Sequence, residues 1–514
     1  MFIGTGKQIK LVWRKERISS AVWLASLTLI TVAVAVAFEG LLDGTEKGSL
    51  LAMFNSPATK AMLGPLYGDG LGAVFAGSML LFTAIAVAIM NVFLVVKNTR
   101  GDEEKGRIEV IRSLPVGRLS NLSAVMIFAV AVNVALSLLI SLSLTVKFEV
   151  GGCFLYGFTL GAIGLFFAVV AALFAQISPS SSGATGFSIA LLGVLYILRM
   201  VGDVSAEWLS KITPLGMILR TQCFAGNKIW PLPVLLLISF AIAATAFYLN
   251  CIRDLDCGLL REKRGNTKGS FLFKNAYGFA FRLLRGGIIA WAVSLLVLGI
   301  AYGSVMDQMP QFMADLGLEL SAGDLFGLLY MVLAVVAAVP AAGSMLKLAA
   351  EEKAKRSENI LSKAVSRQNL MTGFLVIALA ESFIMLFAVM FGLWGASTAA
   401  GLTLNFGAEF VKMMLYLPAV WFMVGLASLL VGLLPEKAGT ITYSYLGVTG
   451  FLLYLGGILN NKFTEYLSPF GYIPKITSGA SLGAGAIISL TALVMIASVM
   501  ITCGYIFYRR RDLI

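Results

Sequence analysis

Twelve long apolar runs constrain this chain more than any other feature. A helix needs about 20 consecutive apolar residues to cross a bilayer, and runs of 18 or so predict such helices. The runs of the first half are Ser19–Phe38, Leu71–Val96, Leu122–Val146, Phe154–Ile177, Ala184–Val201 and Leu232–Ile252. Those of the second half are Gly286–Tyr302, Leu325–Leu346, Leu370–Trp394, Val411–Leu433, Ile441–Leu459 and Leu482–Tyr508. We therefore predict an all-α polytopic membrane protein of about twelve transmembrane helices.

The composition excludes a soluble domain and several kinds of site. The chain is 59% hydrophobic and 13% charged, whereas soluble domains are about 45–50% apolar and about 25% charged. With no histidine and five cysteines that form no CxxC pair, a zinc or redox site has little support. Cys153 and Cys223 could pair near the outer face, although two lone cysteines are more often small apolar fillers.

The basic residues predict how the chain lies in the membrane. If the N-terminus is cytoplasmic, the inner segments hold 29 of the 39 lysines and arginines, as the positive-inside rule requires. Both termini are then cytoplasmic. This bias explains the +12 net charge better than nucleic-acid binding does, because basic segments favour an anionic inner leaflet.

Two charged loops reveal an internal repeat. Residues 101–118, the first charged loop, and 351–367, the second, align without gaps at an offset of 249. Over positions 102–118 this register gives seven identities, among them Glu103 with Glu352 and Arg107 with Arg356. Further landmarks recur in order: the turns SPSSSG and LPEKAG, and the segments EWLSKITPLGMI and EYLSPFGYI.

The repeat predicts the domain organisation. We expect a first six-helix half over 1–255, a cytoplasmic basic linker with an amphipathic helix over 256–285, and a second six-helix half over 286–514. An even number of spans in each half makes the two repeats parallel, related by an axis along the membrane normal.

Each charged loop is read as a docking helix. In the first, acidic residues precede a stripe formed by Ile108, Ile111 and Leu114, and Pro115 is expected to end the helix near Leu114. A lone loop of this kind is more often a solvated connector, but retained acids and bases at fixed positions favour docking to a partner. The candidate docking residues are Glu103, Arg107, Glu109, Arg118, Glu352, Arg356, Glu358 and Arg367.

The acid–acid–x–x–x–Arg–x–Glu pattern followed by a hydrophobic pair and PVGR resembles the loop between the second and third spans of type-2 ABC exporter permeases. The doubled form is similar to the twelve-span antibiotic or polyketide-type exporters. The resemblance implies that each loop is a coupling helix seated on a separate ATPase subunit, two copies in all. It also implies an amphipathic helix before each half, at 8–17 and 271–285. Ala364 replaces Pro115 in the second loop, so the two contacts need not be equivalent.

The nucleotide chemistry is expected in another polypeptide. The chain has no G-x-x-x-x-G-K-[ST] motif, so ATP and Mg²⁺ would bind the partner and this chain would be a transport subunit, not an enzyme. The expected function is ATP-driven export of an amphipathic drug-like or lipid-like molecule by alternating access across a bacterial plasma membrane. The alternative is an ion-coupled twelve-span secondary transporter, whose loop signature the first charged loop meets only loosely.

Two polar residues within predicted spans are candidates for the translocation pathway. Glu381 lies mid-span, and Asn133 lies at a similar depth in the other half, one residue away from exact repeat register with Glu381. An ionisable residue inside a membrane is a functional candidate. A protonated Glu381 bonded to a neighbouring helix is an equally good reading.

Overall fold

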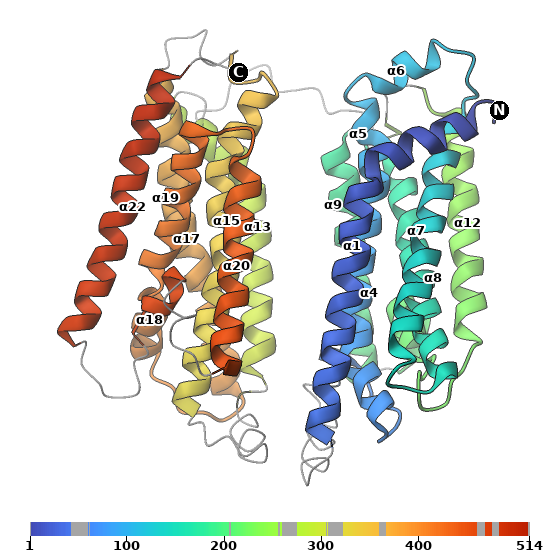
Figure 1. Ribbon diagram of the computed structural model, residues 1–514, viewed down its shortest axis with the longest axis horizontal. Coiled ribbons are helices and arrows are strands. Elements are labelled where there is room, and N and C mark those ends of the chain that lie inside the picture. The colour runs from blue at the N-terminus through green and yellow to red at the C-terminus, as the bar shows by residue number, and fades with distance from the viewer. Residues whose placement is uncertain are drawn as a thin grey trace. The chain divides into compact units, whose positions relative to one another are not determined.

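The computed structural model describes residues 2–42, 60, 62–204, 207–254, 258–259, 275–304, 306, 322–358, 366–459, 468–474 and 483–511. The chain divides into two compact units, Met1–Gly265 and Asn266–Ile514. Within the described ranges every regular element is helical, and each unit is a bundle of long helices (Figure 1).

The described residues of the first unit form six long helices and four short ones. Its elements are α1 (Thr5–Leu42), α4 (Leu71–Asn98), α5 (Arg100–Glu103), α6 (Arg107–Arg112), α7 (Ser120–Leu144), α8 (Val150–Ile177), α9 (Ser181–Val204), α10 (Glu207–Ile212), α11 (Pro214–Leu219) and α12 (Pro231–Ile252).

The second unit follows the same plan. Its elements are α13 (Ala276–Gly303), α15 (Ala322–Lys353), α17 (Arg367–Ala399), α18 (Phe406–Met414), α19 (Leu417–Leu433), α20 (Ala438–Leu459), the 3₁₀ helix η2 (Pro469–Tyr472) and α22 (Ala484–Arg510).

The helices coincide with the predicted apolar runs, which confirms the all-α polytopic membrane fold. Among the described residues, 11 helices are long and apolar enough to cross a membrane. Helix α20 covers the remaining run at 441–459, and several side chains near its end lie outside the described residues.

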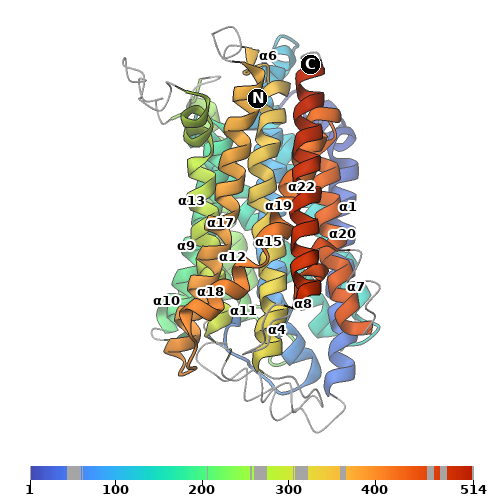
Figure 2. The same ribbon diagram turned by 90° about the vertical axis from the view of Figure 1, so that its left-hand side faces the viewer.

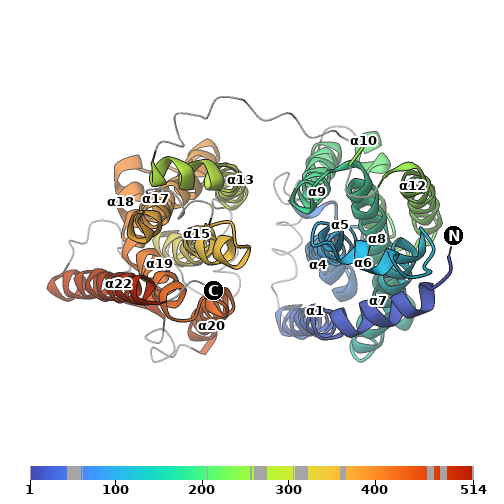
Figure 3. The same ribbon diagram turned by 90° about the horizontal axis from the view of Figure 1, so that it is seen from above.

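The same pairs of helices pack in both units. In the first unit α1 contacts α7, α4 contacts α7, α8 and α9, and α8 contacts α12. In the second, α13 contacts α17, α15 contacts α17, α19 and α20, and α19 contacts α22. Figure 2 shows α15, α17, α19 and α22 side by side, and Figure 3 shows α8 among its neighbours. The repeat seen in the charged loops therefore extends to the packing of each bundle.

Three glycines of α8 bring it close to α7. Gly157, Gly161 and Gly164 face Ser141, Ser137 and Asn133 of α7, and a Cβ added at any of the three would lie within 2.4 Å of one of those residues. Small residues let helix backbones approach closely in membranes, where lipid leaves little hydrophobic drive for association. We call this contact the α7–α8 glycine seam.

The two expected amphipathic segments are parts of longer helices. The amphipathic segments at 8–17 and 271–285 are not separate helices where they are described, because α1 runs unbroken from Thr5 and α13 from Ala276. In α1 the helix changes direction: its first part lies across the end of the bundle before the rest descends along it (Figure 1). The expected linker therefore contains the first turns of α13.

Candidate functional site

The first charged loop folds as two short helices, not as the single helix expected from the sequence. Helix α5 is separated from α6 by Gly106, whose φ of 68° is in the left-handed region. Lys355, at the equivalent position of the second loop, has a φ of 55°. A lysine rarely adopts this conformation, so the retained bend indicates that the loop's tertiary contacts impose the turn. The second loop is described only to Glu358 and again from Ser366.

The second acid of each loop is buried and bound to the last helix of its own unit. Glu103 is 6% exposed, and one of its carboxylate oxygens lies 2.7 Å from Nη2 of Arg253, the residue directly after α12. Glu352 is 3% exposed and forms an ion pair with Arg511, the residue directly after α22. In the first unit Arg100 adds a second cation, with Nη1 at 3.0 Å from Glu103.

The arginine at the end of each loop reinforces the same connection. Arg118 donates a hydrogen bond to the backbone carbonyl of Arg253. Arg367 donates from Nη1 to the carbonyl of Arg511 at 2.6 Å. The loop acid, the arginine after the last helix and the arginine at the end of the loop thus form the same three-residue arrangement in both units. We call each arrangement a clamp: Glu103–Arg253–Arg118 and Glu352–Arg511–Arg367.

The first acid of each loop binds the loop's own arginine. Arg107 Nη1 lies 3.0 Å from Asp102, and Arg356 Nη1 lies 3.6 Å from Glu351. Asp102 also accepts from Lys15 of α1 at 2.7 Å, which fixes the N-terminal helix to the first loop.

Half of the candidate docking residues have partners within their own unit. Of the eight candidates, Glu103 and Glu352 are buried inside their units, and Arg118 and Arg367 bind backbone carbonyls of the last helices. Their retention in register has an internal cause, because an unpaired buried charge would be costly. Arg107, Glu109, Arg118, Arg356 and Glu358 are exposed, and of these Arg118 also binds the carbonyl of Arg253.

Helix α6 presents an apolar surface that the sequence pattern did not predict. Ile108 is buried against the unit, as its stripe position required, but Leu114 of the same stripe is 60% exposed. Val110 of α6 is 71% exposed as well. Large apolar side chains exposed together beyond the ends of the bundle are typical of a contact surface. We call Val110, together with Leu114 just beyond the end of α6, the α6 face.

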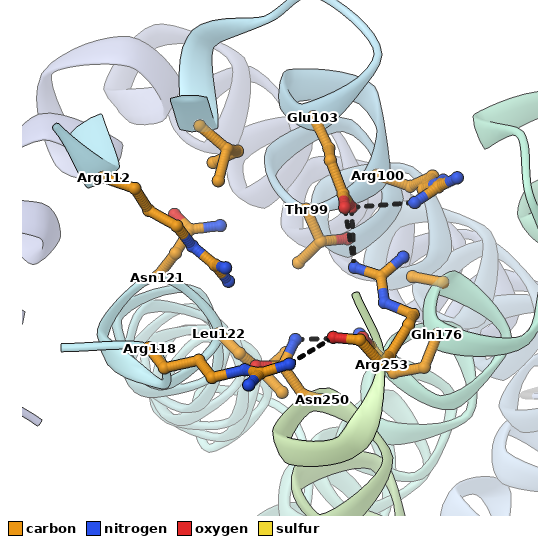
Figure 4. A pocket seen from close by; sticks show the side chains of 12 residues that line it. Thr99, Arg100, Glu103, Arg112, Arg118, Asn121, Leu122, Gln176, Asn250 and Arg253 are labelled. Atoms are coloured by element: carbon orange, nitrogen blue, oxygen red, sulfur yellow. Dashed lines mark hydrogen bonds and ion pairs between the residues drawn. The ribbon is translucent and has the colours of Figure 1, made fainter. Parts of the chain in front are cut away.

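A small pocket lies between the first loop and the ends of α7, α8 and α12 (Figure 4). Its volume is about 20 Å³, room for about one water molecule. Glu103, Arg112, Arg118 and Arg253 all line it. Burial, and then the neighbouring Arg118, lower the pKa of Arg112. The clamp of the first unit thus lies in a strongly basic, partly desolvated cavity.

The opposite end of each unit holds the recurring proline–glycine segments. Thr213 caps α11 by accepting from the Gly216 amide, and Ser468 accepts from the Phe470 amide at the start of η2. A hydroxyl N-cap followed by proline at the first helical position is a strong helix start. Cys223 is buried at this end, and neither it nor Cys153 forms a disulfide.

The two pathway candidates both lie in contacts between helices. Asn133 exchanges side-chain hydrogen bonds with Asn91 of α4, at 2.7 and 3.0 Å. Glu381 is 2% exposed and accepts a hydrogen bond from Ser344 of α15. Asn133 also lines the edge of a groove of about 300 Å³ formed by α7, α8 and the start of α12. Most of the groove's lining is apolar, including Phe158, Leu165, Leu232 and Leu236.

The contact of Glu381 leads to a test. We expect Glu381→Gln to leave efflux within about twofold of the parent, since the amide oxygen can still accept from Ser344. Glu381→Leu should reduce thermal stability by about 1–2 kcal/mol, because it leaves the Ser344 hydroxyl without this acceptor. Efflux of several dyes and thermal unfolding in detergent measure the two effects. Selective loss of cationic substrates in a stable Glu381→Gln protein would instead indicate that the carboxylate contacts the cargo.

The clamp arginines were missed by the sequence reasoning, although a signal for them exists. The tripeptide Arg-Asp-Leu directly follows the last span of each half, at 253–255 and at 511–513. Because these tripeptides lie about 150 residues beyond their loops, only the folded bundle shows that they meet the acids.

Comparisons with known proteins agree with this architecture. The sequence model described as "Multidrug efflux system permease Rv1217c, C-terminal domain" matches residues 6–249 and 273–509. The multidrug efflux system permease protein Rv1217c of Mycobacterium tuberculosis is 32% identical over 535 aligned residues, which cover 99% of this chain and 95% of that protein. The two matched stretches fall one in each unit. They confirm the resemblance to twelve-span exporter permeases that the charged loops suggested. The chain therefore belongs to the family of Rv1217c-type multidrug efflux system permeases, as a multi-pass membrane subunit.

Proposed function

We propose that this chain is the membrane-spanning subunit of an ATP-driven exporter that moves amphipathic, drug-like molecules out of the cell. The observation that carries the proposal is the match along 99% of the chain to a multidrug efflux system permease. The energy would come from separate ATPase subunits, two copies for the two loops, which bind ATP and Mg²⁺ themselves. The absence of a phosphate-binding motif from the sequence supports this division of labour.

The ATPase is proposed to dock on the α6 face and on the exposed charges around it. Exposed apolar side chains surrounded by charges match the usual anatomy of an interface, in which an apolar centre supplies affinity and a polar rim supplies orientation. Val110 and Leu114 form that centre on the first loop, with Arg107 and Glu109 at the rim. Arg356 and Glu358 are the rim candidates of the second loop.

We place both charged loops and both termini on the cytoplasmic side of a bacterial plasma membrane. Within the first unit, α1 and the first loop lie at one end, since Lys15 binds Asp102 and the Gly117 amide donates to the carbonyl of Ile3 at 2.8 Å. In the second unit the clamp joins the loop to the end of α22. The basic residues gathered at these ends favour the cytoplasmic side.

The groove between α7, α8 and α12 is a candidate contact for the apolar part of a substrate. At about 300 Å³, it is at the lower limit of small-molecule sites, which are mostly apolar with a few polar groups. Asn133 and Ser137 supply such groups at its edge. Asn133 is thus kept as a pathway candidate in the first unit and Glu381 in the second.

Reconstitution tests the proposed function. The purified chain alone should hydrolyse no ATP. Together with its ATPase in proteoliposomes, it should move a fluorescent amphipathic dye only when ATP and Mg²⁺ are present on the side of the ATPase. Transport by the chain alone under a proton or sodium gradient would contradict the proposal and support an ion-coupled transporter.

A further inference from the structure

The two clamps connect each charged loop to the last helix of its unit, a connection that chain continuity does not provide. The first loop is joined covalently to α4 and α7, and the second to α15 and α17. In the described part of the chain, α12 and α22 meet the loops through the clamps, in which Arg253 pairs with Glu103 and Arg511 pairs with Glu352. Arg253 and Arg511 are the C-terminal capping residues of α12 and α22.

The same clamp is present in both units. Each clamp consists of the second acid of the loop, the arginine directly after the last helix of the unit, and the arginine at the end of the loop. Each includes an Arg-to-carboxylate ion pair and an Arg-to-carbonyl hydrogen bond. Two independent placements of the same bonds are unlike the scattered ion pairs of a protein surface, which contribute little and vary freely.

Burial makes each clamp stiff. The side chains of Glu103 and Arg253 are 6% and 7% exposed, and those of Glu352 and Arg511 are 2% and 17% exposed. Charge pairs that are shielded from water hold one geometry, because separating them leaves each charge poorly solvated. A displacement of the loop would therefore be carried to the last helix and not absorbed between them.

We propose that each clamp transmits movement of the docked loop to the last helix of its unit, so that loop and last helix move as one body during transport. Glu103, Arg253, Glu352 and Arg511 are thus positioning residues for energy coupling. They act through the helix and do not contact ATPase or substrate. This inference rests on the proposed function only for the source of the movement, and the clamp itself can be tested without the ATPase.

A distance measurement tests the clamp in the second unit. In a chain whose native cysteines are replaced, spin labels at Lys353→Cys and Arg509→Cys report the separation of loop and α22, since both positions are exposed. A second pair, Lys353→Cys with Lys437→Cys, reports the loop against the start of α20. We expect a narrow 353–509 distribution, even without the ATPase, that broadens when Glu352→Gln is added. With ATPase and a non-hydrolysable ATP analogue, 353–437 should shift and 353–509 should not.

A transport measurement then separates coupling from folding. Glu352→Gln and Arg511→Gln should each lower the amount of dye exported per ATP hydrolysed by about tenfold. This is within the usual range of coupling between two sites. ATPase capture should be retained. The charge swap Glu352→Arg with Arg511→Glu should recover part of the coupling. Arg510→Gln is the matched control, because Arg510 is the neighbouring arginine and is exposed.

Each outcome decides one claim. An unchanged 353–509 distribution in Glu352→Gln, or unchanged efflux per ATP, would overturn the clamp. A clamp that holds in the isolated chain while no ATPase binds would leave the clamp intact and contradict the proposed function instead. If neither single variant yields folded protein, and the double charge-swap variant does not restore it, the pair serves only folding. That result would also overturn the proposal.

Discussion

A chain that carries both Val110→Asp and Leu114→Asp is expected to lose its ATPase partner while keeping its fold. The two side chains are 71% and 60% exposed, so the substitutions remove no internal packing. At an interface centre, burying two new carboxylates against an apolar surface should weaken binding by roughly 30-fold or more, by analogy with interface hot spots. Capture of the ATPase by the tagged chain, followed by a titration of affinity, measures the effect.

Val146→Asp is the matched control for this prediction. Val146 is 79% exposed beyond the opposite end of α7, so the same change of residue type falls far from the proposed interface. Charge reversals at Arg107 and Glu109 should have smaller effects, mainly on association rate and salt dependence, as is usual for rim charges. Full ATPase capture by the Val110→Asp, Leu114→Asp chain would refute docking on the α6 face.

The second large effect is expected in the α7–α8 glycine seam. A Cβ on Gly157 would lie 2.4 Å from the backbone oxygen of Ser137 and 2.2 Å from the Ser141 hydroxyl. A hydroxyl can rotate away, but a helix backbone moves only if α7 and α8 separate. Gly157→Ala should therefore destabilise the first unit by about 2–3 kcal/mol, the usual range for overpacking, and Gly157→Leu by more. The apparent unfolding midpoint in detergent should fall by about 5–10 °C for the alanine variant.

Gly151→Ala is the control within the same helix. The closest atom to a Cβ at Gly151 is a Glu149 carboxylate oxygen at 3.8 Å, an ordinary contact. The midpoint should be unchanged or slightly higher, since alanine favours the helix over glycine. Equal midpoints for Gly157→Ala and Gly151→Ala would mean that the seam is not closely packed.

The seam also explains why the polar residues of α7 were hard to interpret from sequence. Asn133 was a pathway candidate because polar groups are rare inside a membrane. In the structure Asn133 bonds to Asn91 across the helices, and Ser137 donates to the carbonyl of Asn133 at 2.9 Å. Whether a polar side chain in a span faces a neighbouring helix or a groove depends on the rotation of that helix, which an almost uniformly apolar sequence does not encode.

The charged loops also show which features can be predicted from sequence and which require the structure. Their repetition was evident from the register of Glu103 with Glu352 and Arg107 with Arg356, but its cause was not. The retained charges predicted a docking surface, and in the structure the buried acids Glu103 and Glu352 pair with Arg253 and Arg511 of the last helices. Val110 and Leu114 are exposed in the structure, and sequence alone could not separate them from the buried Ile108.

The sequence by itself determined the class of the molecule, the positions of its spans and the repeat of its two halves. The length of an apolar run, compared with the thickness of a bilayer, predicts a span. The repeat is found by aligning the chain with itself. Neither requires knowledge of which residues are in contact. Only the tertiary structure decided that α1 and α13 are continuous, that the first loop breaks at Gly106, and that Arg253 and Arg511 meet the loop acids. Those outcomes depend on contacts between segments up to about 150 residues apart. The physical reason is that a buried charge must find a partner in three dimensions, and the chain's linear order does not specify which one.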